Sequence, residues 1–183
     1  MQVPLSILNG SDALRRSLGG LLDAAGLAPR ETVWVSVVKQ PGITLRYYPG
    51  GGHCGPVLIV PAPIKRPYIF DLMPQVSVVV RLIEAGFSVF LMDWAEDGGP
   101  GVPNLSKYSE MICSAAGKVR REARRKPIVL GHSLGGTLAA ISAALEPDSV
   151  SKLVLISAPL RFGEETGALA PIVTWRAHRS RTK

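Results

Sequence analysis

Four short, continuous apolar runs alternate along this chain with stretches whose apolar positions recur at helical spacing. The runs lie at residues 57–60, 87–92, 127–130 and 153–156, and the helical stretches at residues 74–84, 106–124 and 134–145. A strand that is apolar at every position is typical of a parallel sheet that is buried on both faces. The pattern therefore predicts an α/β fold, with a mostly parallel sheet and helices on both faces.

Two further strands are expected before this region. Residues 32–38 and 43–48 are rich in β-branched and aromatic side chains and flank Gln40-Pro41-Gly42, which predicts an N-terminal antiparallel hairpin. Ser11 is a suitable N-cap for an earlier helix with its leucines on one face. We therefore expect an N-terminal helical segment over residues 1–30.

Composition and charge exclude several classes of function. The net charge of +7 is concentrated in residues 118–126 and 176–183. The first cluster is expected on a solvated helix face, and without a nucleic-acid-binding motif we expect no nucleic-acid partner. Cys54 and Cys113 have no CxxC pairing and no histidine at metal-ligand spacing, so neither a metal site nor a disulfide is expected.

The same reasoning applies to membranes. The longest apolar run, residues 57–64, is far shorter than the ~18 residues that suggest a membrane span, so none is expected. The first residues lack the basic start of a secretory signal. We expect a cytoplasmic protein.

Residues Gly131-His132-Ser133-Leu134-Gly135 form a G-x-S-x-G motif between a predicted strand and a predicted helix. In this context the motif is typical of a nucleophile elbow, in which a serine occupies strained backbone and small neighbours let the chain pass closely. We predict that Ser133 is a catalytic nucleophile and that the Leu134 N–H is one donor of an oxyanion hole. The second donor is expected after the strand at 57–60, where Ala62 or Ile64 can donate but the prolines cannot; Ala62 is the candidate.

Other reactive groups are weaker candidates. His132 is expected to point away from Ser133, because neighbouring side chains of an extended strand alternate in direction. Cys54 in a glycine-rich loop and Cys113 in a helix are expected to be bystanders. A dinucleotide-binding protein would share the strand and helix rhythm, but no G-x-G-x-x-G follows any of the predicted strands.

Several motifs together resemble the poly(3-hydroxyalkanoate) synthase family. They are Arg66-Pro67-Tyr68-Ile69-Phe70-Asp71-Leu72, Asp93-Trp94, the run from Gly131 through the elbow, and Ser157-Ala158-Pro159. The resemblance covers residues 57–163 and implies an α/β-hydrolase fold. It also implies an acyltransferase that polymerises hydroxyacyl-coenzyme A through an elbow cysteine, with an aspartate and a histidine later in the chain. Ser133 stands at the position of that cysteine, and a serine fits an esterase or thioesterase equally well.

The order of residues in the chain complicates this resemblance. In the α/β-hydrolases the acid and the histidine follow the nucleophile, on loops after later strands. Glu146 and Asp148 are expected at the wrong end of the sheet, Glu164 or Glu165 would be an unusual acid, and His178 lies in a basic tail expected to be disordered. Asp93 precedes the nucleophile and is expected to be structural.

We therefore expect an incomplete α/β-hydrolase domain over residues 31–163, missing the last strands, and a basic tail over residues 164–183. The hypothesis is a C-terminally truncated or frame-shifted family member. One interpretation is a serine acyl-transfer enzyme that acts on hydroxyacyl-coenzyme A thioesters or carboxylic esters. The alternative is a non-catalytic remnant that binds acyl ligands or polymer granules without turnover.

The expected ligands and partners follow from the resemblance. Coenzyme A thioesters would be substrates, and no resident cofactor is expected. A synthase-type partner subunit or a homo-oligomer is the expected assembly, and the expected location is the cytoplasm or the surface of polymer granules.

Overall fold

The computed structural model describes residues 29–94 and 103–161. In this part of the chain a six-stranded sheet has the order β1-β2-β4-β3-β5-β6. The strands are β1 (Val35–Gln40), β2 (Ile43–Tyr48), β3 (Gly55–Val60), β4 (Phe87–Trp94), β5 (Ile128–His132) and β6 (Lys152–Ile156). The expected helix before Gly26, and Glu164, Glu165 and His178, lie outside the described residues.

The sheet has an antiparallel and a parallel half, as the sequence predicted. β1 pairs with β2 and β2 with β4 in antiparallel fashion, whereas β4, β3, β5 and β6 are parallel neighbours. The β1–β2 turn contains Pro41 and Gly42, and Gly42 has a φ of 84°, which glycine adopts without steric cost.

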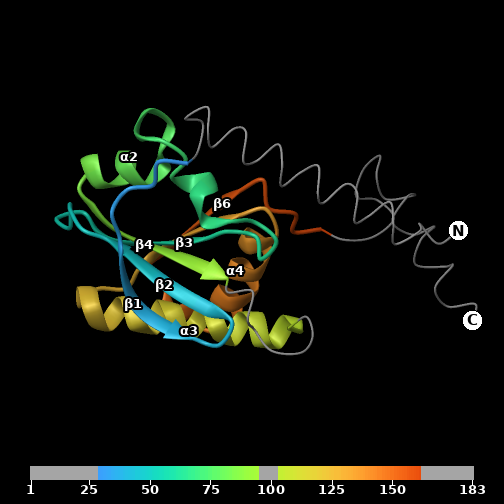
Figure 1. Cartoon of the computed structure of the whole chain (residues 1–183). Coiled ribbons are helices and arrows are strands. Elements are labelled where there is room, and N and C mark those ends of the chain that lie inside the picture. The colour runs from blue at the N-terminus through green and yellow to red at the C-terminus, as the bar shows by residue number, and fades with distance from the viewer. Residues whose placement is uncertain (1–28, 95–102, 162–183) are drawn as a thin grey trace, which may run out of the picture.

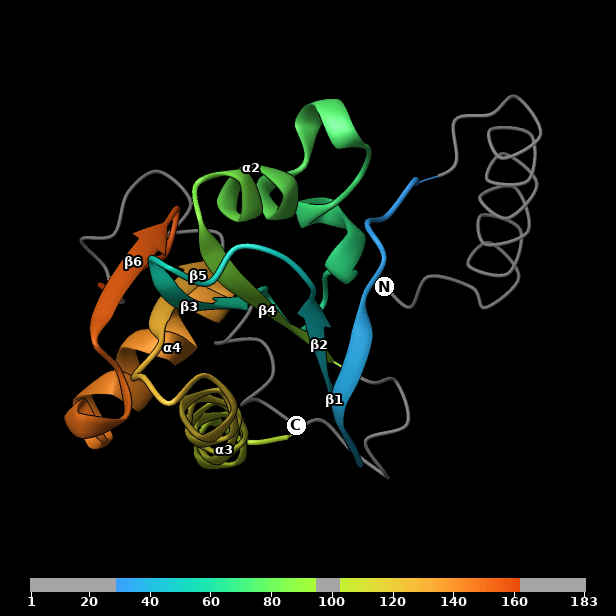
Figure 2. The same cartoon turned by 90° about the vertical axis from the view of Figure 1, so that its left-hand side faces the viewer.

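Helices cover both faces of the sheet. Figures 1 and 2 show α2 (Val78–Glu84) on one face, and α3 (Leu105–Ala123) with α4 (Leu134–Leu145) on the other. Alternate residues of β3 enter different cores: Leu58 and Val60 pack with residues of α3 and α4, and Val57 and Ile59 pack with Phe70 and Val79. Because the side chains of a strand alternate between its two faces, β3 contributes to the cores on both sides of the sheet.

Two predictions about these elements were wrong. The expected helix over residues 74–84 is interrupted, because Ser77 has extended backbone between the short 3₁₀ turn η2 (Pro74–Val76) and α2. The Ser77 hydroxyl accepts a hydrogen bond from the Val80 N–H at 3.0 Å, so Ser77 is the N-cap of the helix.

The second error concerns β6, whose apolar residues were expected to be buried on both faces. Leu153, Val154 and Ile156 remain 36%, 42% and 43% exposed. β6 is the outer strand of the sheet formed by residues 29–94 and 103–161, so only β5 pairs with it there.

Two 3₁₀ turns complete the described elements: η1 (Pro67–Phe70) follows β3, and η3 (Pro147–Ser149) precedes β6. Among the helices described, none combines the length and apolar character needed to cross a bilayer.

Candidate active site

Ser133 is the single residue between β5 and α4. Its backbone has φ 55° and ψ −132°, a conformation that costs a residue with a side chain on the order of 1–3 kcal/mol. Hydrogen bonds hold it on both sides: its N–H donates to the Ile156 carbonyl at 2.9 Å, and its carbonyl accepts from the N–H groups of Gly136 and Thr137 at 2.9 and 3.2 Å. The geometry is that of the sharp strand-to-helix turn expected of a nucleophile elbow.

Close packing around the elbow explains its glycines. A Cβ on Gly131 would lie 2.4 Å from the Cα of Gly136, and one on Gly135 would lie 2.3 Å from the Pro61 carbonyl oxygen. Gly136 also touches the loop after β6, because a Cβ there would lie 2.6 Å from the Cβ of Ala158. No packing role was predicted for Gly136. The sequence feature that could have indicated it is the pair Gly135-Gly136 directly after Leu134.

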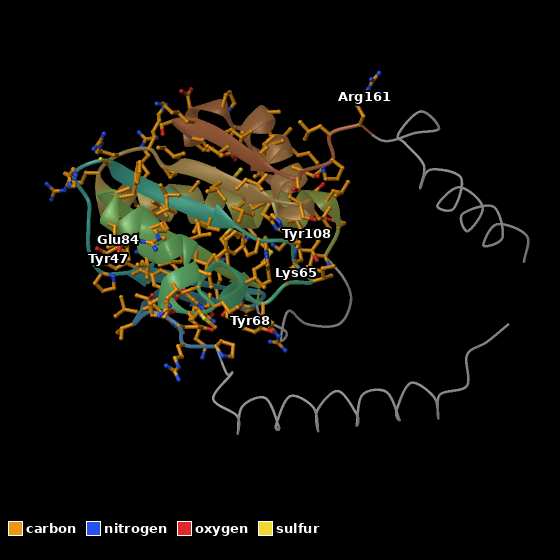
Figure 3. All side chains as sticks on the ribbon, turned by 90° about the horizontal axis from the view of Figure 1, so that it is seen from above. Tyr47, Lys65, Tyr68, Glu84, Tyr108 and Arg161 are labelled. Carbon is orange, nitrogen blue, oxygen red and sulfur yellow. The ribbon has the colours of Figure 1, made fainter. Side chains whose placement is uncertain are left out.

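The elbow lies where parallel strands end. Val60 of β3 pairs with Gly131 of β5, and His132 of β5 pairs with Ile156 of β6. The strands β3, β5 and β6 therefore end at the same level of the sheet. Figure 3 shows residues from this edge, Lys65, Tyr108 and Arg161, on one side of the molecule, and Tyr47 and Glu84 on the other. Ligands of open α/β sheets bind outside the carboxyl ends of the strands, which is this edge.

The two expected oxyanion-hole donors belong to segments that pack together, the loop after β3 and the first turn of α4. Leu134 is the first residue of α4, so no earlier turn of that helix supplies a carbonyl to its N–H. Ala62 follows β3 directly and is 1% exposed, and the carbonyl before it packs against Gly135. Ile64, the other residue considered, is 84% exposed. The structure thus places the Pro61–Ala62 peptide against the first turn of α4.

His132 does not act on Ser133 in this geometry. Its ring meets Phe70 edge to face, with the centroids 5.7 Å apart. Its Nδ1 is buried without a hydrogen-bond partner in the described part of the chain. The side chain therefore faces the α2 layer, whereas the strand alternation predicted only that it points away from Ser133.

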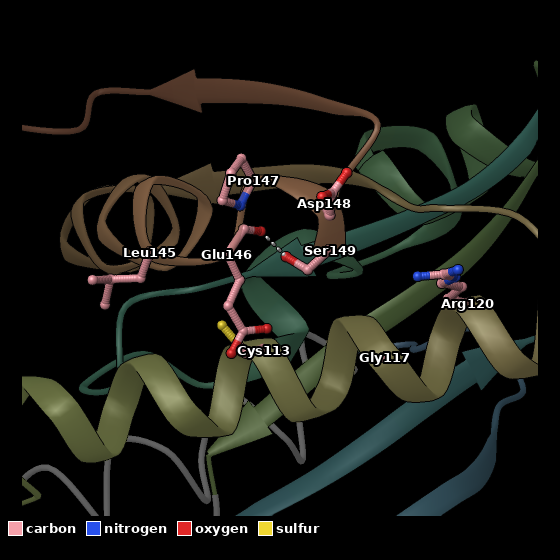
Figure 4. A pocket seen from close by; sticks show the side chains of 8 residues that line it. All are labelled: Cys113, Gly117, Arg120, Leu145, Glu146, Pro147, Asp148 and Ser149. Atoms are coloured by element: carbon pink, nitrogen blue, oxygen red, sulfur yellow. Dashed lines mark hydrogen bonds between the residues drawn. The ribbon is translucent and has the colours of Figure 1, made fainter.

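The acids of the α4–β6 connection lie at the opposite end of the sheet, as expected. Lys126, just before β5, pairs with Asp148 at 3.0 Å and lowers the pKa of that carboxyl. Glu146, Asp148 and Cys113 line a surface pocket of about 410 Å³. Figure 4 shows their side chains. Burial and the nearby Glu146 raise the pKa of the Cys113 thiol, so it is a poor nucleophile.

Asp93 has a structural partner. Arg46 donates to its Oδ2 from Nε at 3.0 Å and from Nη2 at 2.5 Å, and also pairs with Glu31 at 2.6 Å. Burial would lower the pKa of the Arg46 guanidinium, but the hydrogen bonds and charge of Asp93, and the charge of Glu31, raise it overall. Trp34 stacks on the guanidinium at 4.3 Å. These contacts fit the structural role expected for Asp93.

Asp71, in the Arg-Pro-Tyr motif, is fully buried. Its carboxylate accepts hydrogen bonds from the Thr32 N–H at 2.6 Å, the Thr32 hydroxyl at 2.9 Å and the Ser77 hydroxyl at 2.6 Å. It therefore joins the segment before β1 to the N-cap of α2. Sequence reasoning did not assign it a role.

Thr137 was also missed. Its hydroxyl donates to the Pro159 carbonyl at 2.7 Å, which ties the loop after β6 to the first turn of α4.

No group of three metal-ligating side chains gathers anywhere in residues 29–94 and 103–161.

Comparison with known proteins shows the family of this chain. The model of the alpha/beta hydrolase fold family matches residues 64–180. A protein named poly(3-hydroxyalkanoate) polymerase subunit PhaC from Haloferax mediterranei is 36% identical over 152 residues, which are 80% of this chain and 30% of that protein. One of the same name from Cupriavidus necator is 33% identical over 124 residues, 64% of this chain and 21% of that protein. The chain thus spans less than a third of the length of these relatives.

Solved structures support the fold. A monoacylglycerol lipase of Paleococcus ferrophilus has a TM-score of 0.54 at 23% identity, over 77% of this chain and 52% of the lipase. A carboxylesterase structure from Nitrososphaera gargenis has a TM-score of 0.55 at 16% identity, over 82% of this chain and 54% of that one. The expected fold class and the expected family resemblance are both confirmed.

Proposed function

The chain belongs to the alpha/beta hydrolase fold family and resembles the poly(3-hydroxyalkanoate) synthases within it, and we propose that it performs acyl transfer with Ser133 as the nucleophile. The observation that carries the proposal is the positive φ of Ser133 between β5 and α4. In a nucleophile elbow, strained backbone of this kind lifts the hydroxyl clear of the sheet, and Ser133 follows the carboxyl end of β5. Strain of this kind persists where the surrounding structure enforces it, and it clusters at active sites.

The proposed chemistry starts with attack of the Ser133 Oγ on the carbonyl carbon of an acyl group. The Oγ proton passes to a base, and the tetrahedral oxyanion receives hydrogen bonds from the N–H groups of Leu134 and Ala62. The thiol or alcohol then leaves with a proton, and the acyl-serine reacts with water or with another hydroxyl. One oxyanion donor is worth about 3 kcal/mol of transition-state stabilisation. The positive end of the α4 dipole adds to this stabilisation.

We propose (hydroxy)acyl-coenzyme A thioesters as substrates, with carboxylic esters as the second class. The relatives' name, poly(3-hydroxyalkanoate) polymerase, supports hydroxyacyl groups. In a polymerising reaction, the hydroxyl that attacks the acyl-serine belongs to the growing polymer. In a hydrolase, water attacks the acyl-serine. A serine serves both reactions when a base is present.

A second candidate is ligand binding without turnover. The observation in its favour is that, within residues 29–94 and 103–161, no histidine is hydrogen-bonded to Ser133, and the ring of His132 packs on Phe70 instead. Without a base the serine hydroxyl is a weak nucleophile.

The deciding experiment uses the purified chain and a fluorophosphonate probe, with Ser133→Ala as the matched variant. Labelling that Ser133→Ala abolishes supports the nucleophile. Turnover of 3-hydroxybutyryl-coenzyme A to polymer, or hydrolysis of p-nitrophenyl butyrate, then separates synthase from esterase. Labelling without either turnover favours the binding function, and folded protein that does not label removes Ser133 as the nucleophile.

The assembly is a further part of the proposal. In the sheet formed by residues 29–94 and 103–161, β6 is the outer strand and has exposed apolar side chains. Both features support association with a second copy or with a synthase-type subunit, because an outer strand edge pairs readily with another chain. Light scattering over a tenfold range of protein concentration distinguishes a monomer from a homo-oligomer.

A further inference from the structure

The indole of Trp94 reaches from the end of β4 to the loop after β3. Its Nε1 donates a hydrogen bond to the Pro61 carbonyl at 2.8 Å. The ring is held by Tyr108, which it meets edge to face with the centroids 5.4 Å apart. Trp94 thus makes a directed polar contact with the residue just before the proposed oxyanion donor Ala62.

That contact determines the direction of the Ala62 N–H. The Pro61 C=O and the Ala62 N–H belong to one planar peptide unit, in which oxygen and hydrogen point to opposite sides of a trans bond. The same carbonyl oxygen packs against Gly135, where a Cβ would lie 2.3 Å from it. Gly135 contacts this carbonyl side-on, since the same Cβ would also lie 2.4 Å from the Pro61 carbonyl carbon. Because the oxygen is held toward the Trp94 indole, the Ala62 N–H points to the side away from Trp94.

The peptide on the other side of Ala62 is also held. The Ala62 carbonyl accepts a hydrogen bond from the Lys65 N–H at 2.8 Å. Pro61 and Pro63 have no N–H of their own, so these two carbonyl contacts are the backbone hydrogen bonds described for the Pro61-Ala62-Pro63 turn. The peptide planes on both sides of the Ala62 Cα are therefore held, and the Trp94 side chain holds the one that contains the Ala62 N–H.

We infer that Trp94 is a positioning residue of the oxyanion hole, which orients the Ala62 N–H through the Pro61 carbonyl. This inference rests on the proposed role of Ser133. It gives the tryptophan of the Asp-Trp pair a function distinct from that of Asp93, whose carboxylate binds Arg46. It also accounts for Gly135, which leaves room for the carbonyl that Trp94 holds.

The test is Trp94→Phe, which keeps an aromatic ring beside Tyr108 and removes the N–H. The measurement is fluorophosphonate labelling of Ser133, separated into the maximal rate and the concentration for half-maximal rate. We expect the maximal rate to fall at least about tenfold, while the half-maximal concentration changes less than about twofold. Trp34→Phe is the matched control, because that indole stacks on Arg46 instead, and it should leave the labelling rate unchanged.

A second variant guards against a loss of folding. Replacing Trp94 by benzothienylalanine keeps the shape of the indole and substitutes sulfur for the N–H, so the same fall in rate is expected with an unchanged melting temperature. Wild-type rates in either folded variant would overturn the inference. Absence of labelling in the folded wild-type chain would remove the proposed function of Ser133, and the inference with it.

Discussion

The Cα of Gly136 lies 2.4 Å from the point that a Cβ on Gly131 would occupy. The end of β5 and the first turn of α4, on either side of Ser133, are therefore in backbone-to-backbone contact. This contact leaves no room for a methyl group, since both partners are main chain and cannot rotate away.

We expect Gly131→Ala to lower the free energy of unfolding by about 1–3 kcal/mol, because the added methyl forces backbone apart. Urea unfolding followed by circular dichroism measures it. Gly117→Ala is the control: it lies within α3, and its Cβ would meet only Arg121 Nη1 at 3.6 Å. That change should stabilise the chain by roughly 0.5–1 kcal/mol, because alanine favours the helix. Equal stabilities of Gly131→Ala and the wild type would contradict the packing described.

Ser133→Gly should be more stable than Ser133→Ala by about 1 kcal/mol. Both lack the hydroxyl, but only glycine adopts a φ of 55° with a ψ of −132° without strain. Comparing the two thermal unfolding curves at equal protein concentration checks the difference. If the alanine variant proves the more stable, the backbone at residue 133 is not strained.

The carboxylate of Asp71 and the hydroxyl of Ser77 should be energetically coupled. Asp71→Asn replaces a buried acceptor of three hydrogen bonds, and a loss of roughly 3 kcal/mol in unfolding free energy is expected. Ser77→Ala removes the N-cap of α2, at a cost of about 1–2 kcal/mol. In a double-mutant cycle the combined loss should fall short of the sum by about 1 kcal/mol, since the two residues share a bond. Additive losses would show that the pair does not interact.

Cys54 should react with iodoacetamide at least about tenfold faster than Cys113 in the folded chain at pH 8. Cys54 is exposed, whereas burial and Glu146 raise the pKa of the Cys113 thiol, so less of it is thiolate at a given pH. The rate at Cys113 should therefore rise at higher pH than that of an unperturbed thiol. Glu146→Gln, which removes the neighbouring charge, should speed the reaction at Cys113. Mass spectrometry of tryptic peptides measures both rates, and similar rates in the folded chain would contradict this assignment.

The regular elements were largely predictable, because the buried side chains of a strand or a helix recur at a fixed spacing in the sequence. The range predicted for α4 matches residues 134–145, and the hairpin partners and the four parallel strands were found where expected. The break at Ser77 was not predicted. The Ser77 hydroxyl donates to the Asp71 carboxylate, which the fold buries against Thr32. β6 was predicted to be buried because its apolar run resembles that of β3, but its exposure depends on what lies beside it.

For the site, local sequence determined the elbow itself: a serine between a strand and a helix, flanked by residues small enough for main chains to touch. It also determined the family, through motifs that are contiguous in the chain. Only the tertiary structure decided the roles of Trp94, Thr137 and Asp71. Their hydrogen-bond partners are Pro61, Pro159 and Thr32, which are distant in the sequence and which the fold brings into contact with them. A hydrogen bond between residues 33 positions apart leaves no periodic pattern, so it becomes visible only when the strands are paired.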